Sequence, residues 1–127
     1  MNGVIDTSVF VAAEQGRPLD ADKLPAQAAI SVATLAELEL GVLMASSAAE
    51  RDQRTASLRR VVDQHMVLPI DTAVASAYAE LQAMMRRAGR RPNVQDTWIA
   101  ATARAHGVAV YTQDADFDHL PVDVVRV

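Results

Sequence analysis

The chain has 127 residues, half of them hydrophobic, a net charge of −4 and no cysteine. This length fits one domain over residues 1–127. The missing cysteines exclude disulfides, thiolate metal sites and cysteine nucleophiles, so any metal must be held by oxygen or imidazole. The acidic balance argues against a general nucleic-acid binder, and the sequence contains no expected membrane span or secretory signal, which indicates a cytoplasmic protein.

Apolar segments of strand type alternate with helical patterns along the chain. In order, the expected elements are a strand at 3–5, a helix from Thr7 or Ser8, a loop at 16–25, a strand at 28–32, helices at 34–45 and 46–65, an edge segment at 66–70, helices at 73–88 and 93–107, a strand at 108–112, a turn at 113–121 and a strand at 122–127. This alternation predicts a single α/β domain with a mainly parallel central sheet of four or five strands flanked by helices.

Four acidic residues are expected at one edge of that sheet. They are Asp6 at the end of the first strand, Glu37 one turn into the helix after the second strand, Asp96 in the first turn of its helix, and Asp114 just after the fourth apolar segment. In a parallel α/β layer the carboxyl ends of strands and the amino ends of the following helices share the edge where ligands bind. The four carboxylates should therefore lie close together.

Each acid also has an ordinary structural explanation. Asp6 could cap a helix, Thr34 and Glu37 match the spacing of a capping box, and Asp96 and Asp114 could serve a helix dipole and a turn. These explanations stay open for each residue taken alone.

The position of Asp96 favours a shared site over separate caps. Asp96 lies on the helix face that Ile99, Ala100 and Ala103 mark as buried, where a carboxylate is rarely placed for solubility. Carboxylates gathered at a partly buried edge repel one another unless a cation is present. Oxygen ligands without cysteine or an ordered histidine set favour Mg²⁺ or Mn²⁺.

Four ordered motifs carry a resemblance to a known family. They are "VIDTSVFVA" at the N-terminus, "TLAELELG" around Glu37, "VQDTWIAATARAHG" around Asp96 and "TQDADF" around Asp114. Together they resemble the PIN-domain ribonucleases, and among them the VapC-type toxins of type II toxin-antitoxin systems. The resemblance covers nearly the whole chain.

The resemblance implies a metal-dependent endoribonuclease that cleaves RNA phosphodiester bonds with metal-activated water. It implies Asp6, Glu37, Asp96 and Asp114 as the catalytic set. Asp6, Asp96 and Asp114 would hold Mg²⁺ or Mn²⁺, with Glu37 assisting and Asp116 as an additional ligand ranked below Asp114. Thr7 or Ser8, and Thr112, are expected to add hydroxyl contacts at the site.

The same resemblance implies several partners: an RNA substrate, a cognate VapB-type antitoxin and a second copy of the chain in a homodimer, with no membrane. The Met84, Met85 and Tyr78 region could serve such an interface, although each residue fits a core position. Among the clustered arginines, Arg90 and Arg91 lie beyond Gly89 in the loop toward Asp96 and are the candidates for binding RNA phosphates.

The same residues argue against functions of other classes. A phosphoryl-accepting receiver needs a late lysine, but the only lysine is Lys23, and a D-x-D phosphatase needs an acid where Ser8 stands. No phosphate-binding G-x-x-x-x-G-K loop is present. The remaining alternative is a catalytically weak or inactive PIN-fold module that binds nucleic acid or protein.

Overall fold

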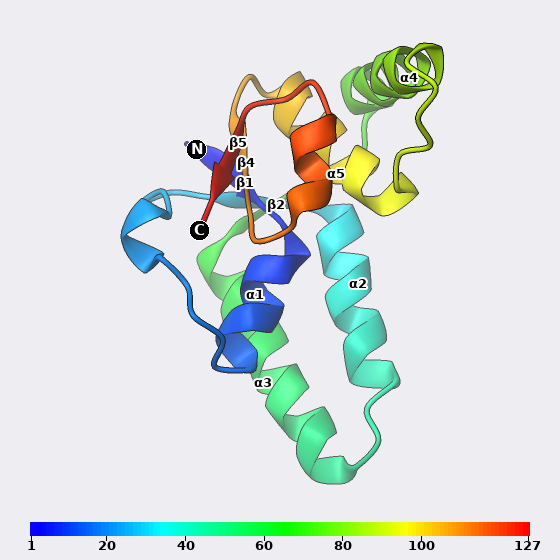
Figure 1. Ribbon diagram of the computed structural model, residues 1–127. Helices are drawn as coiled ribbons and strands as arrows, with labels where there is room; N and C mark the ends of the chain where they lie inside the picture. The colour runs from blue at the N-terminus through cyan, green and yellow to red at the C-terminus, as the bar shows by residue number, and fades with distance from the viewer.

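The computed structural model describes residues 1–127 and contains one five-stranded sheet in which every neighbouring pair is parallel (Figure 1). The strands are β1 Gly3–Ile5, β2 Ala29–Ser31, β3 Met66–Leu68, β4 Ala109–Thr112 and β5 Val124–Arg126. Their order across the sheet is β3-β2-β1-β4-β5. This confirms the expected α/β class and parallel sheet, and it places the strand with Pro69 behind it at an edge, as expected.

Five α-helices and two short 3₁₀ helices connect the strands. They are α1 Thr7–Glu14, η1 Ala21–Lys23, α2 Val32–Leu43, α3 Ala48–Gln64, α4 Thr72–Arg87, α5 Val94–Ala105 and η2 Ala115–His119. None of the helices combines the length and the apolar character that a membrane crossing requires.

The start of α2 differs from the expectation. We expected the helix to begin at Thr34, but it begins at Val32 because the Ser31 side chain caps it by accepting from the Ala33 backbone N at 3.0 Å. Thr34 is therefore a buried residue inside the helix and does not form a capping box with Glu37. Because Glu37 does not take part in a capping box, its carboxylate is free for another role.

Helices cover both faces of the sheet, and the side chains of each strand alternate between the two cores. Val4 and Val110 belong to the core beneath α4 and α5, whereas Ile5 and Ile30 belong to a smaller core with α1 and α3. Because both faces are covered, the strands β1 and β2 near the centre of the sheet are buried along their whole length. Figure 1 shows α2 and α3 extending together from the sheet as a helical hairpin.

The strand order creates a topological switch point between β1 and β4. From β1 the chain builds outward through β2 to β3, then crosses back to place β4 and β5 on the other side of β1. In open parallel sheets, ligands bind outside the carboxyl ends of the strands at such a point. Asp6 follows β1 directly, and Asp114 lies two residues beyond β4.

Candidate active site

Asp6 occupies the buried centre of the switch point. Its side chain is only 3% exposed, and its Oδ2 accepts hydrogen bonds from Ser8 Oγ at 2.6 Å, Ser8 N at 3.3 Å and Thr112 Oγ1 at 2.9 Å. No buried side-chain oxygen of the protein lacks a partner, so Oδ1, which accepts no hydrogen bond, reaches the surface of the site. Asp6 thus caps α1 with one oxygen and presents the other.

The Ser8 and Thr112 hydroxyls that donate to Asp6 also connect β1 to the segment after β4. Ser8 Oγ accepts from the Gln113 N at 3.0 Å, and Thr112 Oγ1 accepts from the Asp114 N at 2.9 Å. Each hydroxyl therefore donates to the carboxylate while it accepts from the backbone that follows β4, so that Ser8 joins the two segments and Thr112 holds its own turn. This network fixes the position of Asp6 relative to Asp114. Ser8 and Thr112 are two of the residues at which hydroxyl contacts were expected.

Glu37 lies one turn inside α2, on the side of the helix that meets α1. Thr7 Oγ1 donates to its Oε1 at 3.0 Å, and Thr34 Oγ1 lies 3.1 Å from the same Thr7 hydroxyl. Burial raises the pKa of the Glu37 carboxyl, the hydrogen bond from Thr7 lowers it, and the charge of Asp6 raises it further, for a net increase. Glu37 is therefore a stronger base than an exposed glutamate.

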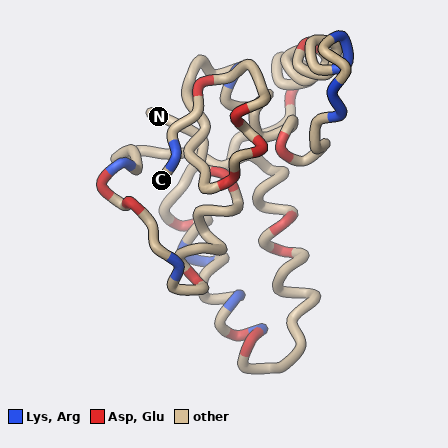
Figure 2. The backbone as a smooth tube through the Cα atoms, viewed as in Figure 1, with Lys and Arg blue, Asp and Glu red and all other residues tan.

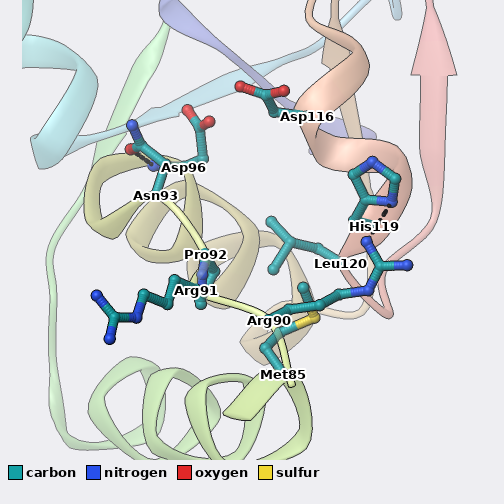
Figure 3. A pocket seen from close by; sticks show the side chains of 9 residues that line it. All are labelled: Met85, Arg90, Arg91, Pro92, Asn93, Asp96, Asp116, His119 and Leu120. Atoms are coloured by element: carbon teal, nitrogen blue, oxygen red, sulfur yellow. Dashed lines mark hydrogen bonds between the residues drawn. The ribbon is translucent and has the colours of Figure 1, made fainter. Parts of the chain in front are cut away.

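Three further carboxylates form a cluster that one ion could bridge. Oxygen atoms of Asp96, Asp114 and Asp116 all lie within 4.8 Å of one another. Asp96 is in the first turn of α5, whose Asn93 cap accepts from the Asp96 N at 3.1 Å, and Asp114 caps η2 by accepting from the Asp116 N at 2.8 Å. Figure 3 shows Asp96 and Asp116 facing each other from α5 and η2.

Asp96 is the electrostatic centre of the site. Its carboxylate accepts no hydrogen bond, whereas burial and the charges of Asp6, Asp114, Asp116 and Glu37 together raise its pKa to about 7. Burial is the largest of these causes, and Asp6 is the largest of the charges. A half-buried carboxylate with four acidic neighbours and no donor is costly in the absence of a cation.

The donor set fits a hard divalent cation. All the converging groups are carboxylate oxygens, which suit Mg²⁺ or Mn²⁺ better than Zn²⁺, and no histidine belongs to the three-acid cluster. A cation there would remove the repulsion that raises the pKa of Asp96. Asp96, Asp114 and Asp116 are placed to hold it, with the accessible oxygen of Asp6 nearby.

The structure brings the five predicted acids, Asp116 included, to one edge of the sheet. Asp116, which we ranked below Asp114, belongs to the tightest cluster, whereas Asp6 and Glu37 lie outside that cluster and act on Asp96 through their charges. The alternating acids in "DADFD" carried this signal, but only the short η2 helix shows that the first two, and not Asp118, turn inward.

The arginines predicted to bind RNA lie next to this acidic edge. Figure 2 shows basic residues on the segment between α4 and α5, while acidic residues gather around the centre of the fold. Arg90 and Arg91 line a pocket of about 500 Å³ together with Asp96, Asp116 and His119. Within this pocket, Arg90 Nη1 lies 3.0 Å from His119 Nδ1.

Comparison with known proteins identifies relatives over nearly the whole chain. Residues 3–123 match the PIN domain family. The chain is 44% identical to Ribonuclease VapC5 of Mycobacterium tuberculosis, covering 98% of this chain and 95% of that protein, and 43% identical to Ribonuclease VapC4 of the same organism, covering 96% and 94%.

Solved structures share the same architecture. The crystal structure of VapBC-5, a member of the VapBC family of toxin-antitoxin systems from Mycobacterium tuberculosis, aligns with a TM-score of 0.89 at 42% identity, covering 99% of this chain and 98% of that one. FitAcB from Neisseria gonorrhoeae aligns with a TM-score of 0.79 at 28% identity, covering 96% and 95%. The resemblance seen in the sequence motifs is confirmed by these matches.

Proposed function

Because the chain belongs to the PIN domain family, we propose that it is a metal-dependent endoribonuclease that acts as the toxin of a toxin-antitoxin pair. Relatives that match nearly the full chain are named VapC ribonucleases. The observation that carries the proposal is the cluster of Asp96, Asp114 and Asp116, with an unpaired, half-buried Asp96 at its centre, at the switch point of a parallel sheet.

Asp96, Asp114 and Asp116 are proposed to hold Mg²⁺ or Mn²⁺, with Asp6 as a further ligand through its accessible oxygen. When bound, such a cation activates water and neutralises the negative charge that develops on the phosphate. Asp6 is held rigidly by Ser8 and Thr112, so its position does not depend on the ion. Asp96, in contrast, gains its principal partner on binding.

Glu37 is proposed to orient and deprotonate the attacking water. Its raised pKa strengthens it as a base, and the proton of Thr7 fixes one carboxylate oxygen so that the other can face the substrate. Attack by water, rather than by the RNA 2′-hydroxyl, leaves 5′-phosphate and 3′-hydroxyl ends. Products with 2′,3′-cyclic phosphate would contradict this assignment.

Arg90 and Arg91 are proposed to hold RNA phosphates beside the acidic edge. A polyanion approaching clustered carboxylates needs compensating cations, and arginine binds phosphate through paired N–H donors. Both residues are exposed and line the pocket that contains Asp96 and Asp116.

A VapB-type antitoxin is the proposed protein partner, since the VapBC-5 structure belongs to the VapBC family of toxin-antitoxin systems. Two features of this chain support a protein-binding surface near α2. The final turn of α2 exposes Leu40 by 57% and Leu43 by 72%, and a separate groove that includes Phe10 and Leu38 contains Glu37. An apolar segment covering this groove would reach the active site.

A homodimer is also proposed, with α4 as the contact helix. Met84 is 42% exposed on α4 and offers an apolar contact. Met85 instead lies in the core, and Tyr78 stacks on Trp98 with ring centroids 3.7 Å apart. Of the three residues considered for an interface, Met84 is therefore the one that faces outward.

The decisive experiment is cleavage of a mixed RNA pool by the purified, antitoxin-free protein with Mg²⁺ or Mn²⁺. The controls are EDTA, a folded Asp96→Asn variant and an Asp118→Asn variant, which removes an acid of η2 that pairs with Arg126 at the surface. We expect cleavage to be lost with EDTA and in Asp96→Asn but kept in Asp118→Asn. Absence of cleavage in every sample, with RNA binding retained, would favour the inactive binding module.

A further inference from the structure

The pocket beside the acidic cluster has two chemically different ends. Asp96 and Asp116 stand at one end, Arg90 and His119 stand at the other, and Leu120 lies between them (Figure 3). Its volume of about 500 Å³ is in the range of small-ligand sites. A ligand that spans the pocket therefore meets carboxylates, then an apolar wall, then N–H donors.

Arg90 is held in place by its own backbone. Gly89 adopts φ +75° after the end of α4, and the Arg90 N donates to the Met85 O at 2.9 Å while the Gly89 N donates to the Arg86 O at 3.0 Å. This pair of bonds is the Schellman arrangement that ends many helices. The start of the Arg90 side chain is thus as fixed as the helix end itself.

The far end of the Arg90 side chain is held by His119. Arginine can only donate, so in the 3.0 Å contact between Arg90 Nη1 and His119 Nδ1 the imidazole nitrogen accepts. The neutral ring then carries its proton on Nε2 and keeps one free donor. Figure 3 shows Arg91, which no such contact holds, extending away from this pair.

We propose that Arg90, positioned by His119, binds the phosphate next to the scissile phosphate of an RNA strand. The inference rests on the proposed ribonuclease function and names a subsite within it. With one phosphate at the acidic cluster, a neighbouring phosphate reaches the Arg90 end, where the remaining guanidinium N–H groups and His119 Nε2–H are all donors. The apolar wall at Leu120 then lies against the nucleotide between the two phosphates.

The first test compares Arg90→Ala with Arg60→Ala, a control that removes the same charge from α3, where the Arg60 side chain donates a hydrogen bond to Ser57. On a cleavable RNA we expect Arg90→Ala to raise KM on the order of 10-fold, with kcat nearly unchanged, and to reduce the salt dependence of RNA binding by about one phosphate contact. Arg60→Ala should match the wild type. Equal KM values and salt slopes in all three proteins would overturn the assignment.

The second test neutralises single phosphates of the substrate. Oligonucleotides with one methylphosphonate at each position flanking the cleavage site are compared in wild type and Arg90→Ala. At one adjacent position the modification should weaken wild-type cleavage on the order of 10-fold and have no further effect in Arg90→Ala. Additive losses at every position would overturn the assignment while leaving the ribonuclease intact. A wild-type protein that cleaves no RNA would overturn the proposed function and this subsite with it.

The third test addresses His119 as a positioning residue. His119→Ala should raise KM a few-fold without lowering kcat, and His119→Asn should restore KM because the amide oxygen replaces Nδ1 as the acceptor for Arg90. Loss of kcat in both variants would instead place His119 in the chemistry, and equal defects in Ala and Asn variants would show that it does not act through Arg90.

Discussion

The two halves of the acidic edge are built in opposite ways. On the sheet side, Asp6 is almost fully buried and accepts three hydrogen bonds from Ser8 and Thr112. On the helix side, the Asp96 carboxylate accepts none and its pKa is raised to about 7 by burial and by four acidic neighbours. Hydrogen-bond donors of the protein stabilise the Asp6 carboxylate, whereas the Asp96 carboxylate has no donor and needs a cation.

This difference suggests a division of labour. A carboxylate fixed by donors supplies geometry, because its orientation persists without a ligand. A carboxylate held against repulsion supplies affinity, because binding a cation removes the repulsion. The chain obtains the first from short side chains on the sheet edge and the second from a helix and a 3₁₀ turn that approach from the other side.

The largest effects should come from the helix side of the cluster. Asp114→Asn and Asp116→Asn keep the shape of the side chain, and Asn can still cap η2, but each removes one charged ligand. We expect each to reduce metal-dependent cleavage on the order of 100-fold, while Asp118→Asn stays close to wild type. If an Asp116→Asn variant measured under single turnover has normal activity, Asp116 is not a metal ligand and Asp114 is the only ligand from this segment.

A smaller loss should follow when the sheet side is loosened. Ser8→Ala and Thr112→Val each remove a donor to Asp6, and partners of metal ligands typically matter 10- to 100-fold, so about that loss of activity is expected. Each variant should also lose about 1 kcal/mol of unfolding free energy. Thr112→Ser keeps the hydroxyl and is the matched control. If stability falls but cleavage does not, the network supports the fold and not the site.

The pH dependence of stability should separate the two halves in the metal-free protein. Because the pKa of Asp96 rises from 3.8 to about 7 on folding, the folded chain binds more protons than the unfolded chain between these values. The contribution of Asp96 therefore lowers the unfolding free energy as pH rises from about 4 to about 7. In EDTA, Asp96→Asn should match wild type near pH 4 and exceed its stability at pH 8.

Urea unfolding at several pH values measures this contrast, with Asp118→Asn as the charge-matched control. If the unfolding free energies of wild type and Asp96→Asn change equally with pH, burial and neighbouring charges do not destabilise the Asp96 carboxylate. Added Mg²⁺ should then stabilise wild type at pH 8 but have little effect on Asp96→Asn.

The sequence predicted the elements and the acids of the edge because both follow local rules. Period-two and helical patterns mark the strands and helices, and in a parallel sheet a carboxylate at a strand end lies at the common edge. The start of α2 was misplaced because Ser31 and Thr34 are both acceptable caps, and burial of Thr34 decided between them. The contact between Arg90 and His119 joins residues 29 positions apart, which no local pattern encodes.

Asp116 shows the same limit inside the site. Asp114, Asp116 and Asp118 alternate in sequence, and a strand-like segment would have placed all three on one face. The five-residue η2 helix turns the segment instead, so Asp116 joins Asp96 while Asp118 faces outward to pair with Arg126 at 3.3 Å. Which acid turned inward depended on a conformation too short for a periodic signal.

The smallest expected effect concerns Glu37, whose carboxyl interacts electrostatically with Asp6 and with Asp96. Thr7 donates to Glu37 and lowers its pKa against the opposing effects of burial and Asp6. Thr7→Val should therefore raise the pKa of Glu37 further. If Glu37 acts as the base, it must be ionised, and the acidic limb of the kcat/KM profile should move to higher pH.

Thr72→Val, at the exposed start of α4, is the control for the loss of a hydroxyl. A limb that moves to lower pH in Thr7→Val would mean that the Thr7 proton does not stabilise the Glu37 carboxylate. A limb that stays fixed in Thr7→Val and persists in Glu37→Gln would assign it to another acid of the edge. The half of the site held against repulsion would then supply the base as well as the metal ligands.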